Sequence, residues 1–203
     1  MKNTETIMWK EINETACSFD NIVKNNKSTI EKLADAIKKS GKNNFMLAAR
    51  GTSYHALMYF KYMLEINAPY TAGYVAPSVI TLYDGKIDFS RSIFLACSQS
   101  GMALDVSESM KVAKKQGAIT IAITNDENSL LAKQADYHLF CSCGEEVSVA
   151  ATKTYSAQLF ISYWLASLLA ENKDMIAKFD EETPKIQFDP ERHDGSANYA
   201  KPC

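Results

Sequence analysis

The sequence predicts one α/β domain in three layers, with a parallel sheet between two layers of helices. Short apolar segments alternate with segments of helical periodicity, and this order is typical of a parallel sheet covered on both faces. The chain has 203 residues, of which 46% are hydrophobic, enough for one sizeable core and too few for two large domains. The predicted strands cover residues 45–49, 70–75, 92–97, 118–124 and 137–140.

A helical region comes first, over residues 9–39, where apolar side chains recur at spacings of three and four. The run Asn25-Asn26-Lys27 predicts a break in this region, with Ser28 capping a second helix through a capping-box pattern. Gly41 is expected to end that helix. The later predicted helices cover residues 53–66, 77–83, 103–116, 129–133 and 152–171. From residue 178 onwards the prolines and charges show no periodicity, which predicts an irregular tail.

Composition argues against several classes of function. The net charge is −2 and no basic run is present, so a nucleic-acid partner is not expected. The longest apolar stretch, residues 157–170, is too short to span a bilayer, so no membrane partner is expected either. The first residues lack the layout of a signal peptide, and we therefore expect a cytoplasmic protein.

Motifs for cofactors and metals are also missing from the sequence. There is no Gly-x-Gly-x-x-Gly after the first predicted strand, no Gly-Lys-Ser/Thr and no Gly-x-Ser-x-Gly, so no cofactor is expected. Cys141 and Cys143 form Cys-x-Cys without a second pair or a nearby histidine. We expect free thiols there and no metal site.

The four residues after the third predicted strand, which we call the serine loop, are suited to binding an anion. Ser98, Gln99 and Ser100 offer hydroxyl and amide donors, and Gly101 lets the backbone approach a ligand closely. The helix that follows adds free N–H groups and a partial positive charge. The serine loop holds no lysine or arginine, so neutral donors would hold the anion. That chemistry suits a sugar phosphate, which must bind and leave easily. A capped turn rich in small residues is the alternative interpretation of this loop.

A second polar turn, the first loop (residues 50–53), follows the first predicted strand. Gly51 permits a sharp turn, while Thr52 and Ser53 place hydroxyls at the start of a helix. A ligand contact is one interpretation, and an ordinary helix cap is the plainer one. His55, one turn further on, is a weak candidate for catalysis, since a packed or surface histidine is the more common case.

The third loop, residues 144–154, joins the last predicted strand to the long helix. Its small residues, including Val149 and Ala150, allow a ligand to approach closely. Glu146 is a candidate base, and Lys153 is a candidate partner for an anion or a carbonyl. The plainer interpretation is a solvated acidic turn followed by the start of a helix.

Taken together, the three loops resemble those of the SIS (sugar isomerase) domain. The segments that carry the resemblance are residues 49–56, 98–101 and 146–159, and residues 76–79 also fit. The resemblance covers about residues 9–172 and is strongest to family members that isomerise, aminate or deaminate fructose 6-phosphate or glucosamine 6-phosphate. It implies a flavodoxin-like five-stranded sheet, a dimer and a hexose 6-phosphate ligand. The implied division is helices over residues 1–40, a SIS domain over 41–175 and a tail over 176–203.

The resemblance also implies roles for individual residues. Ser98, Gln99 and Ser100 would hold the phosphate. Thr52 and Ser53, next to Gly51, would lie beside the phosphate or the sugar. Val149 and Ala150 would offer backbone groups to sugar hydroxyls. A threonine that also binds phosphate is usual near Ala103, so one donor is expected to be missing here.

Three hypotheses on function follow from the resemblance. Enzymes of the family carry two SIS units, with the base, the ring-opening histidine and the imine-forming lysine in or after the second. We expect this chain to hold one unit and to pair with a partner unit or with a second copy of itself. It is then an enzyme unit, a non-catalytic sugar-phosphate binding module or a truncated product. His55, Glu146 and Lys153 are its only catalytic candidates, and none stands at a family catalytic position.

Overall fold

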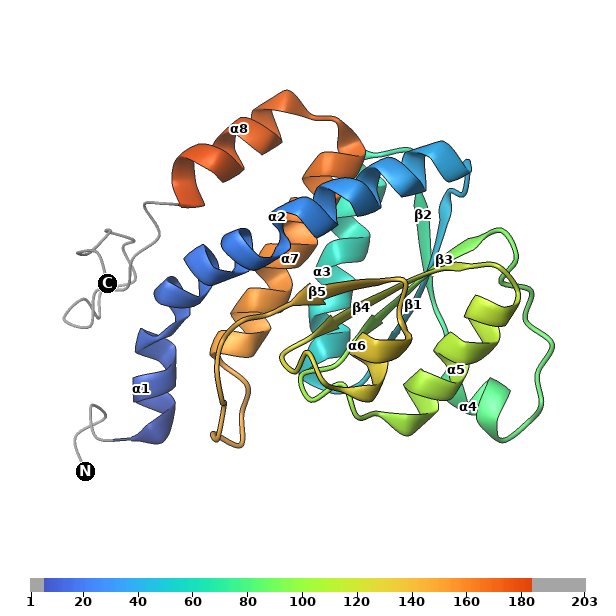
Figure 1. The fold of residues 1–203 in the computed structure, drawn as a ribbon, viewed down its shortest axis with the longest axis horizontal. Helices are drawn as coiled ribbons and strands as arrows, with labels where there is room; N and C mark the ends of the chain where they lie inside the picture. Colours follow the sequence, from blue (N-terminus) through green and yellow to red (C-terminus); the bar gives the residue numbers. More distant parts are fainter. Residues whose placement is uncertain (1–5, 184–203) are drawn as a thin grey trace.

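The computed structural model describes residues 6–183 and confirms the predicted three-layer fold (Figure 1). Five parallel strands form one sheet in the order β2-β1-β3-β4-β5. This is the order of flavodoxin-like sheets, in which the chain reverses its direction of winding between β1 and β3. The strands are β1 (Asn44–Ala49), β2 (Thr71–Tyr74), β3 (Ser92–Cys97), β4 (Ile119–Thr124) and β5 (Tyr137–Phe140).

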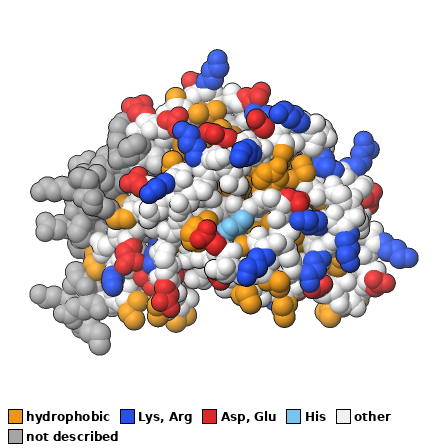
Figure 2. Space-filling model, in the orientation of Figure 1, with side chains coloured by type: hydrophobic (Ala, Val, Ile, Leu, Met, Phe, Trp, Pro, Cys, Tyr) orange, Lys and Arg blue, Asp and Glu red, His pale blue; other side chains and the backbone are white. Residues whose placement is uncertain are grey.

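Helices cover both faces of the sheet. One face carries α2 (Thr15–Ser40), α3 (Thr52–Asn67) and α7 (Lys153–Ala170), while α4 (Pro77–Thr81), α5 (Leu104–Lys115) and α6 (Leu130–Gln134) lie on the other (Figure 1). Two further helices, α1 (Ile7–Asn13) and α8 (Lys173–Glu182), pack against α2 and α7 respectively. Acidic and basic side chains are both distributed over the face of the molecule that Figure 2 shows.

The period of two in the strands divides the core into two clusters. On β1 and β3, Phe45, Leu47 and Leu95 point toward the layer of α2, α3 and α7. Ala48 and Ala96 point the other way, toward α5. Because side chains alternate across a strand, successive residues of each strand enter different clusters, and Phe94 of β3 joins Ala48 and Ala96 on the α5 side.

The predicted break at residues 25–27 is wrong, because α2 runs without interruption from Thr15 to Ser40. Asn26 is buried, and its amide bonds to the edge strand β5: Oδ1 accepts from the Phe140 N–H at 2.7 Å, and Nδ2 donates to the Phe140 carbonyl at 2.8 Å. The polar side chain that suggested a loop therefore pairs with the exposed edge of the sheet. The helical region is instead divided at Glu14, between α1 and α2.

The predicted start of the irregular tail at residue 178 is also wrong, since α8 continues to Glu182. Asn172 caps this helix by accepting from the N–H groups of Asp174 and Met175. Phe179 anchors it by stacking on Trp164, with ring centroids 4.9 Å apart. The rest of the predicted tail, residues 184–203, lies outside the described residues.

Most of the apolar helix α7 is buried within this chain. Residues Phe160, Trp164 and Leu165 are buried between the helices of its own layer and α8. Among the described residues, no helix is both long and apolar enough to cross a membrane. Within residues 6–183, no group of three or more His, Cys, Asp or Glu side chains is placed to hold a metal ion. Cys141 and Cys143 are buried free thiols.

Candidate functional site

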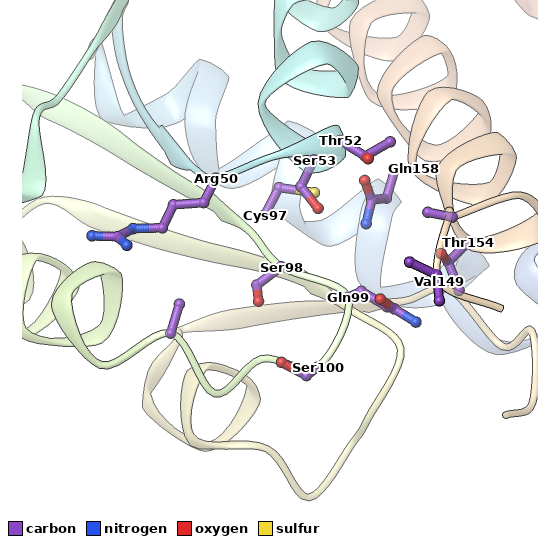
Figure 3. A pocket seen from close by; sticks show the side chains of 12 residues that line it. Arg50, Thr52, Ser53, Cys97, Ser98, Gln99, Ser100, Val149, Thr154 and Gln158 are labelled. Carbon is purple, nitrogen blue, oxygen red and sulfur yellow. The ribbon is translucent and has the colours of Figure 1, made fainter. Parts of the chain in front are cut away.

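The three loops singled out in the sequence meet at the C-terminal edge of the sheet. They enclose a cavity of about 250 Å³ beside the ends of β1 and β3, where the winding of the sheet reverses (Figure 3). Ligands of open α/β sheets bind in the crevice at this point. The cavity is lined by Arg50, Thr52, Ser53, Cys97, Ser98, Gln99, Ser100, Ala103, Val149, Ala151, Thr154 and Gln158.

The serine loop forms the floor of this cavity and is tied to the neighbouring strand. The Ser98 N–H donates to the carbonyl of Ile123, and the Gln99 carbonyl accepts from the Asn125 N–H at 2.8 Å. The hydroxyl of Ser98 accepts from the Gly101 N–H at 3.2 Å, and that of Ser100 accepts a longer bond from the Met102 N–H. These bonds use backbone groups and hydroxyl lone pairs. Both hydroxyl protons therefore remain free to donate to a ligand.

Gly101 does not line the cavity but determines the shape of the serine loop. Its φ is +64°, a region that other residues adopt only with strain. A Cβ atom at this position would lie 2.2 Å from Oγ of Ser129. The Gly101 carbonyl also accepts from the Leu131 N–H at 3.1 Å, which joins the loop to α6. Glycine is required here for packing as well as for backbone conformation.

The helix that follows the serine loop begins without a side-chain cap. Ala103 is the N-cap residue of α5, and its methyl group cannot accept from the first N–H groups of the helix. Ala103 also lines the cavity. The uncapped N–H groups and the helix dipole therefore favour an anion beside Ser98 and Ser100.

The first loop brings a second uncapped helix to the cavity. Gly51 is the N-cap of α3, with φ +54° and ψ −133°, and it provides no side-chain hydrogen bond to the helix. Thr52 is exposed and Ser53 is buried, and both line the cavity. Burial raises the pKa of the neighbouring Cys97 thiol to about 12, although a hydrogen bond with Ser53 acts in the opposite direction. Cys97 is therefore a neutral wall residue, not a nucleophile.

A cation also lies at the edge of the cavity, on the first loop. Arg50 lines the cavity and forms an ion pair with Asp105, in the first turn of α5. In Figure 3 its guanidinium group extends away from Ser53 and Gln158. The pair joins the first loop to the helix that follows the serine loop, and its positive charge is already compensated.

The third loop uses its carboxylate to cap a helix. Glu146 accepts from the N–H and the hydroxyl of Thr152, at 2.8 and 3.1 Å, and from the N–H and the hydroxyl of Thr154. These bonds satisfy the free N–H groups at the start of α7. Glu146 thus fixes the point at which the third loop enters α7, and it does not line the cavity.

The N-terminal helices hold the third loop from outside. Glu11 is buried and accepts from the N–H groups of Val147 and Ser148, at 2.5 and 3.2 Å. The Nζ atom of Lys153 is 2.7 Å from the carboxylate of Glu14, and the Lys153 side chain is only 3% exposed. Glu11 thus bonds to the backbone of this loop, while Lys153 is paired with a carboxylate from the N-terminal region.

The structure places the candidate residues in two groups. The cavity is lined by the predicted ligand contacts Thr52, Ser53, Ser98, Gln99, Ser100 and Val149. Gly51, Gly101 and Ala150 are loop residues outside that lining. Among the catalytic candidates, His55 is exposed on α3, with its ring against Tyr54, while Glu146 and Lys153 are bonded as described above.

Sequence reasoning missed two buried polar residues that line the cavity. Thr154 and Gln158 are both on α7, four residues apart, so they lie on the same side of the helix. Both fall within the segment that carried the third part of the resemblance. Their four-residue spacing, starting at the end of a candidate loop, places them on one face of α7, but nothing local shows that this face borders the cavity.

Comparison with known proteins identifies the family. The sequence model of the SIS domain matches residues 40–168. The chain is 32% identical over 189 residues to a glutamine–fructose-6-phosphate aminotransferase [isomerizing] of Thermococcus kodakarensis, with 88% of this chain and 30% of that protein covered. The enzyme of the same name from Thermotoga maritima is 34% identical over 170 residues, with 81% and 28% covered. The chain thus spans less than a third of the length of these relatives.

Solved structures agree with this result. The C-terminal domain of glucosamine-fructose-6-phosphate aminotransferase from Francisella tularensis superimposes with a TM-score of 0.73 at 29% identity, covering 90% of this chain and 54% of that one. A Silicibacter pomeroyi protein provisionally described as a phosphosugar isomerase gives a TM-score of 0.82 at 28% identity, covering 89% and 55%. The fold, including the N-terminal helices, is therefore found in proteins whose chains are about twice as long.

Proposed function

We propose that this chain, which belongs to the SIS domain family, binds a sugar phosphate in the cavity at the C-terminal edge of its sheet. The observation that carries the proposal is the pairing of the hydroxyl-lined serine loop with the uncapped start of α5. Neutral donors and a helix dipole favour an anion without a metal ion. The names of the relatives, which refer to fructose 6-phosphate and to phosphosugars, support a sugar phosphate as that anion.

In this proposal the phosphate group lies on the serine loop. Ser98 and Ser100 donate their hydroxyl protons, Gln99 adds its amide, and the first N–H groups of α5 complete the site. Gly101 contributes by keeping the loop in its left-handed turn. Because Ala103 provides no hydroxyl, the backbone supplies the donor that a threonine would otherwise supply.

The carbon chain of the sugar then extends toward the first and third loops. Thr52 and Ser53, positioned by Gly51, offer hydroxyls on one side. Val149 and Ala150 are exposed and lie on the loop that borders the other side, where their backbone groups can meet sugar hydroxyls. We propose fructose 6-phosphate or glucosamine 6-phosphate as the ligand class.

We further propose that the chain binds this ligand as one unit of an isomerase, deaminase or aminotransferase and does not convert it alone. Moving a proton between adjacent carbons needs a free base, and ring opening needs an acid. Glu146 and Lys153 are bonded elsewhere, and His55 is on the outer surface of α3. A purified chain that deaminates glucosamine 6-phosphate by itself would favour the enzyme alternative.

The proposal includes a partner unit, in a homodimer or in another chain, and a cytoplasmic location. Met102 and Leu104 support the partner, because these exposed apolar side chains flank the cavity residue Ala103. Sedimentation velocity at micromolar concentration measures the assembly.

Thermal unfolding with fructose 6-phosphate tests the binding proposal. A ligand at 100 times its Kd adds about 2.7 kcal/mol of stability, which for a chain of this length raises Tm by roughly 5–10 °C. We expect this rise for the wild type and its loss in a Ser98→Ala, Ser100→Ala double variant. Ser109→Ala is the matched control, since Ser109 bonds within α5 and does not line the cavity. An unchanged wild-type Tm at millimolar ligand would contradict the proposal.

A further inference from the structure

Gln158 has an unsatisfied polar atom at the cavity. Its side chain lines the cavity, although only 1% of the residue is exposed. Within the described residues, its Oε1 atom has no hydrogen-bond partner. A buried carbonyl oxygen without a donor is costly, so native proteins rarely keep one without a reason. A ligand that supplies the missing donor would provide that reason.

The position of the amide separates it from the two serines of the serine loop, Ser98 and Ser100. Gln158 projects from α7 toward the space between Ser53 and Gln99, whereas Ser98 and Ser100 lie on the opposite side of the cavity (Figure 3). A ligand whose phosphate lies on the serine loop would therefore direct its carbon chain toward Gln158.

The chemistry of the unsatisfied atom restricts the group that can meet it. A phosphate at neutral pH offers mainly acceptor oxygens, so it cannot satisfy a carbonyl oxygen. A hydroxyl or an amino group carries the required proton. Rotation about the last side-chain bond exchanges the two ends of the amide, so Gln158 can accept from such a group and can also donate to a neighbouring oxygen.

We propose that Gln158 is a specificity-determining residue that binds a hydroxyl or amino group on the carbon chain of the ligand and makes no contact with its phosphate. This inference rests on the proposed function and deepens it. It assigns recognition of the sugar to α7 and recognition of the phosphate to the serine loop. The cavity then discriminates in favour of polyhydroxylated phosphate esters over inorganic phosphate.

Isothermal titration of a Gln158→Met variant with two probes tests the assignment. Methionine keeps the length of the side chain but removes both polar ends. We expect affinity for fructose 6-phosphate to fall about tenfold. Affinity for inorganic phosphate should not change, and the unliganded Tm should not fall, because no hydrogen bond to Oε1 is lost within the protein.

Ser162→Ala is the matched control. Ser162 is one turn further along α7, and among residues 6–183 its buried oxygen also has no partner, but it does not line the cavity. We expect this variant to bind both probes as the wild type does. If Gln158→Met lowers the affinity for both probes equally, or for neither, the inference is wrong but the proposed function stands. A wild-type chain that binds neither probe would overturn the proposed function, and this inference with it.

Discussion

The serine loop and the third loop border the same cavity but use their polar groups in different ways. In the serine loop, the side chains of Ser98, Gln99 and Ser100 are neutral and make only local bonds, so their donors remain available. In the third loop, Glu146 caps α7 and Lys153 pairs with Glu14. One loop leaves its polar groups for a ligand, and the other uses its charges to hold its own shape.

The difference teaches that polar residues in a candidate motif cannot be given roles from their chemistry alone. A carboxylate and a lysine beside a cavity suggest acid–base chemistry, yet here both contribute to the architecture. Two serines and an amide suggest an ordinary capped turn, yet they line the cavity.

The largest effect is expected at Gly101, which gives the serine loop its shape. Gly101→Ala must adopt a positive φ and place a methyl group 2.2 Å from Oγ of Ser129. Ser129 cannot easily move, because its hydroxyl caps α6 through the Ala132 N–H. Backbone strain and overpacking together predict a loss of about 2–4 kcal/mol in the free energy of unfolding, measured with urea.

Gly41→Ala is the control that separates these two causes. Gly41, the C-cap of α2, also has a positive φ and is in the left-handed region, but a Cβ atom there would meet no atom within 4 Å. Only backbone strain remains, so a loss of about 1–2 kcal/mol is expected. If both variants lose the same stability, packing against Ser129 does not determine the loop, and our account of the serine loop is wrong.

The second effect concerns the ion pair between Lys153 and Glu14. Removal of the carboxylate is expected to cost more stability than removal of the lysine. Glu14→Gln removes the carboxylate that is bonded to the buried ammonium group of Lys153, which predicts a loss of about 2 kcal/mol. Lys153→Met removes that charge and leaves Glu14, whose side chain is 42% exposed, to be hydrated, so a smaller loss is expected.

Urea unfolding of both variants, beside Glu108→Gln, measures this asymmetry. Glu108 pairs with Lys111 on the surface of α5, and removal of that exposed pair is expected to cost close to nothing. A Lys153→Met variant that is less stable than Glu14→Gln would show that the lysine stem, and not the buried charge, holds the loop.

Much of the fold could be predicted from the sequence because its strands are short apolar runs between helical patterns. The failures came from side chains whose partners are distant along the chain. Asn26 looked like a helix breaker because its bonds to Phe140 cannot be seen locally. Residues 178–182 looked irregular because the packing of Phe179 on Trp164 depends on the tertiary structure.

The candidate site also contains residues that the sequence predicts and residues that it does not. The motifs identified Ser98, Ser100 and Ser53, because short polar turns at strand ends must meet at one edge of a parallel sheet. Gln158 was missed because nothing local distinguishes a cavity amide from a core amide on an apolar helix. From the sequence alone Glu146 is a candidate base. Its four bonds to Thr152 and Thr154 form only when the loop folds back, so they cannot be predicted from the sequence.

The smallest of the three effects is a pH dependence at Glu11, the carboxylate that holds the third loop. Burial raises its pKa, but hydrogen bonds from Ser148 and Val147 and the charge of Lys153 outweigh burial, so the pKa lies below its ordinary value of 4.5. Its contribution to stability is therefore complete above about pH 4.5 and is lost as the pH falls through the lower, folded value. Glu11→Gln keeps an acceptor for both N–H groups and loses only the charge. At pH 7 we expect it to be less stable than the wild type by about 1 kcal/mol or less.

Urea unfolding of wild type and Glu11→Gln at a series of pH values between 7 and roughly 3 tests whether the charge of Glu11 causes the difference in stability. The difference between the two proteins should be greatest at pH 7 and should shrink as the carboxylate becomes protonated. A difference that stays constant over this range would mean that the shape of the side chain, and not its charge, holds Val147 and Ser148. The contrast between a charged third loop and a neutral serine loop would then apply to Glu14 and Lys153 but not to Glu11.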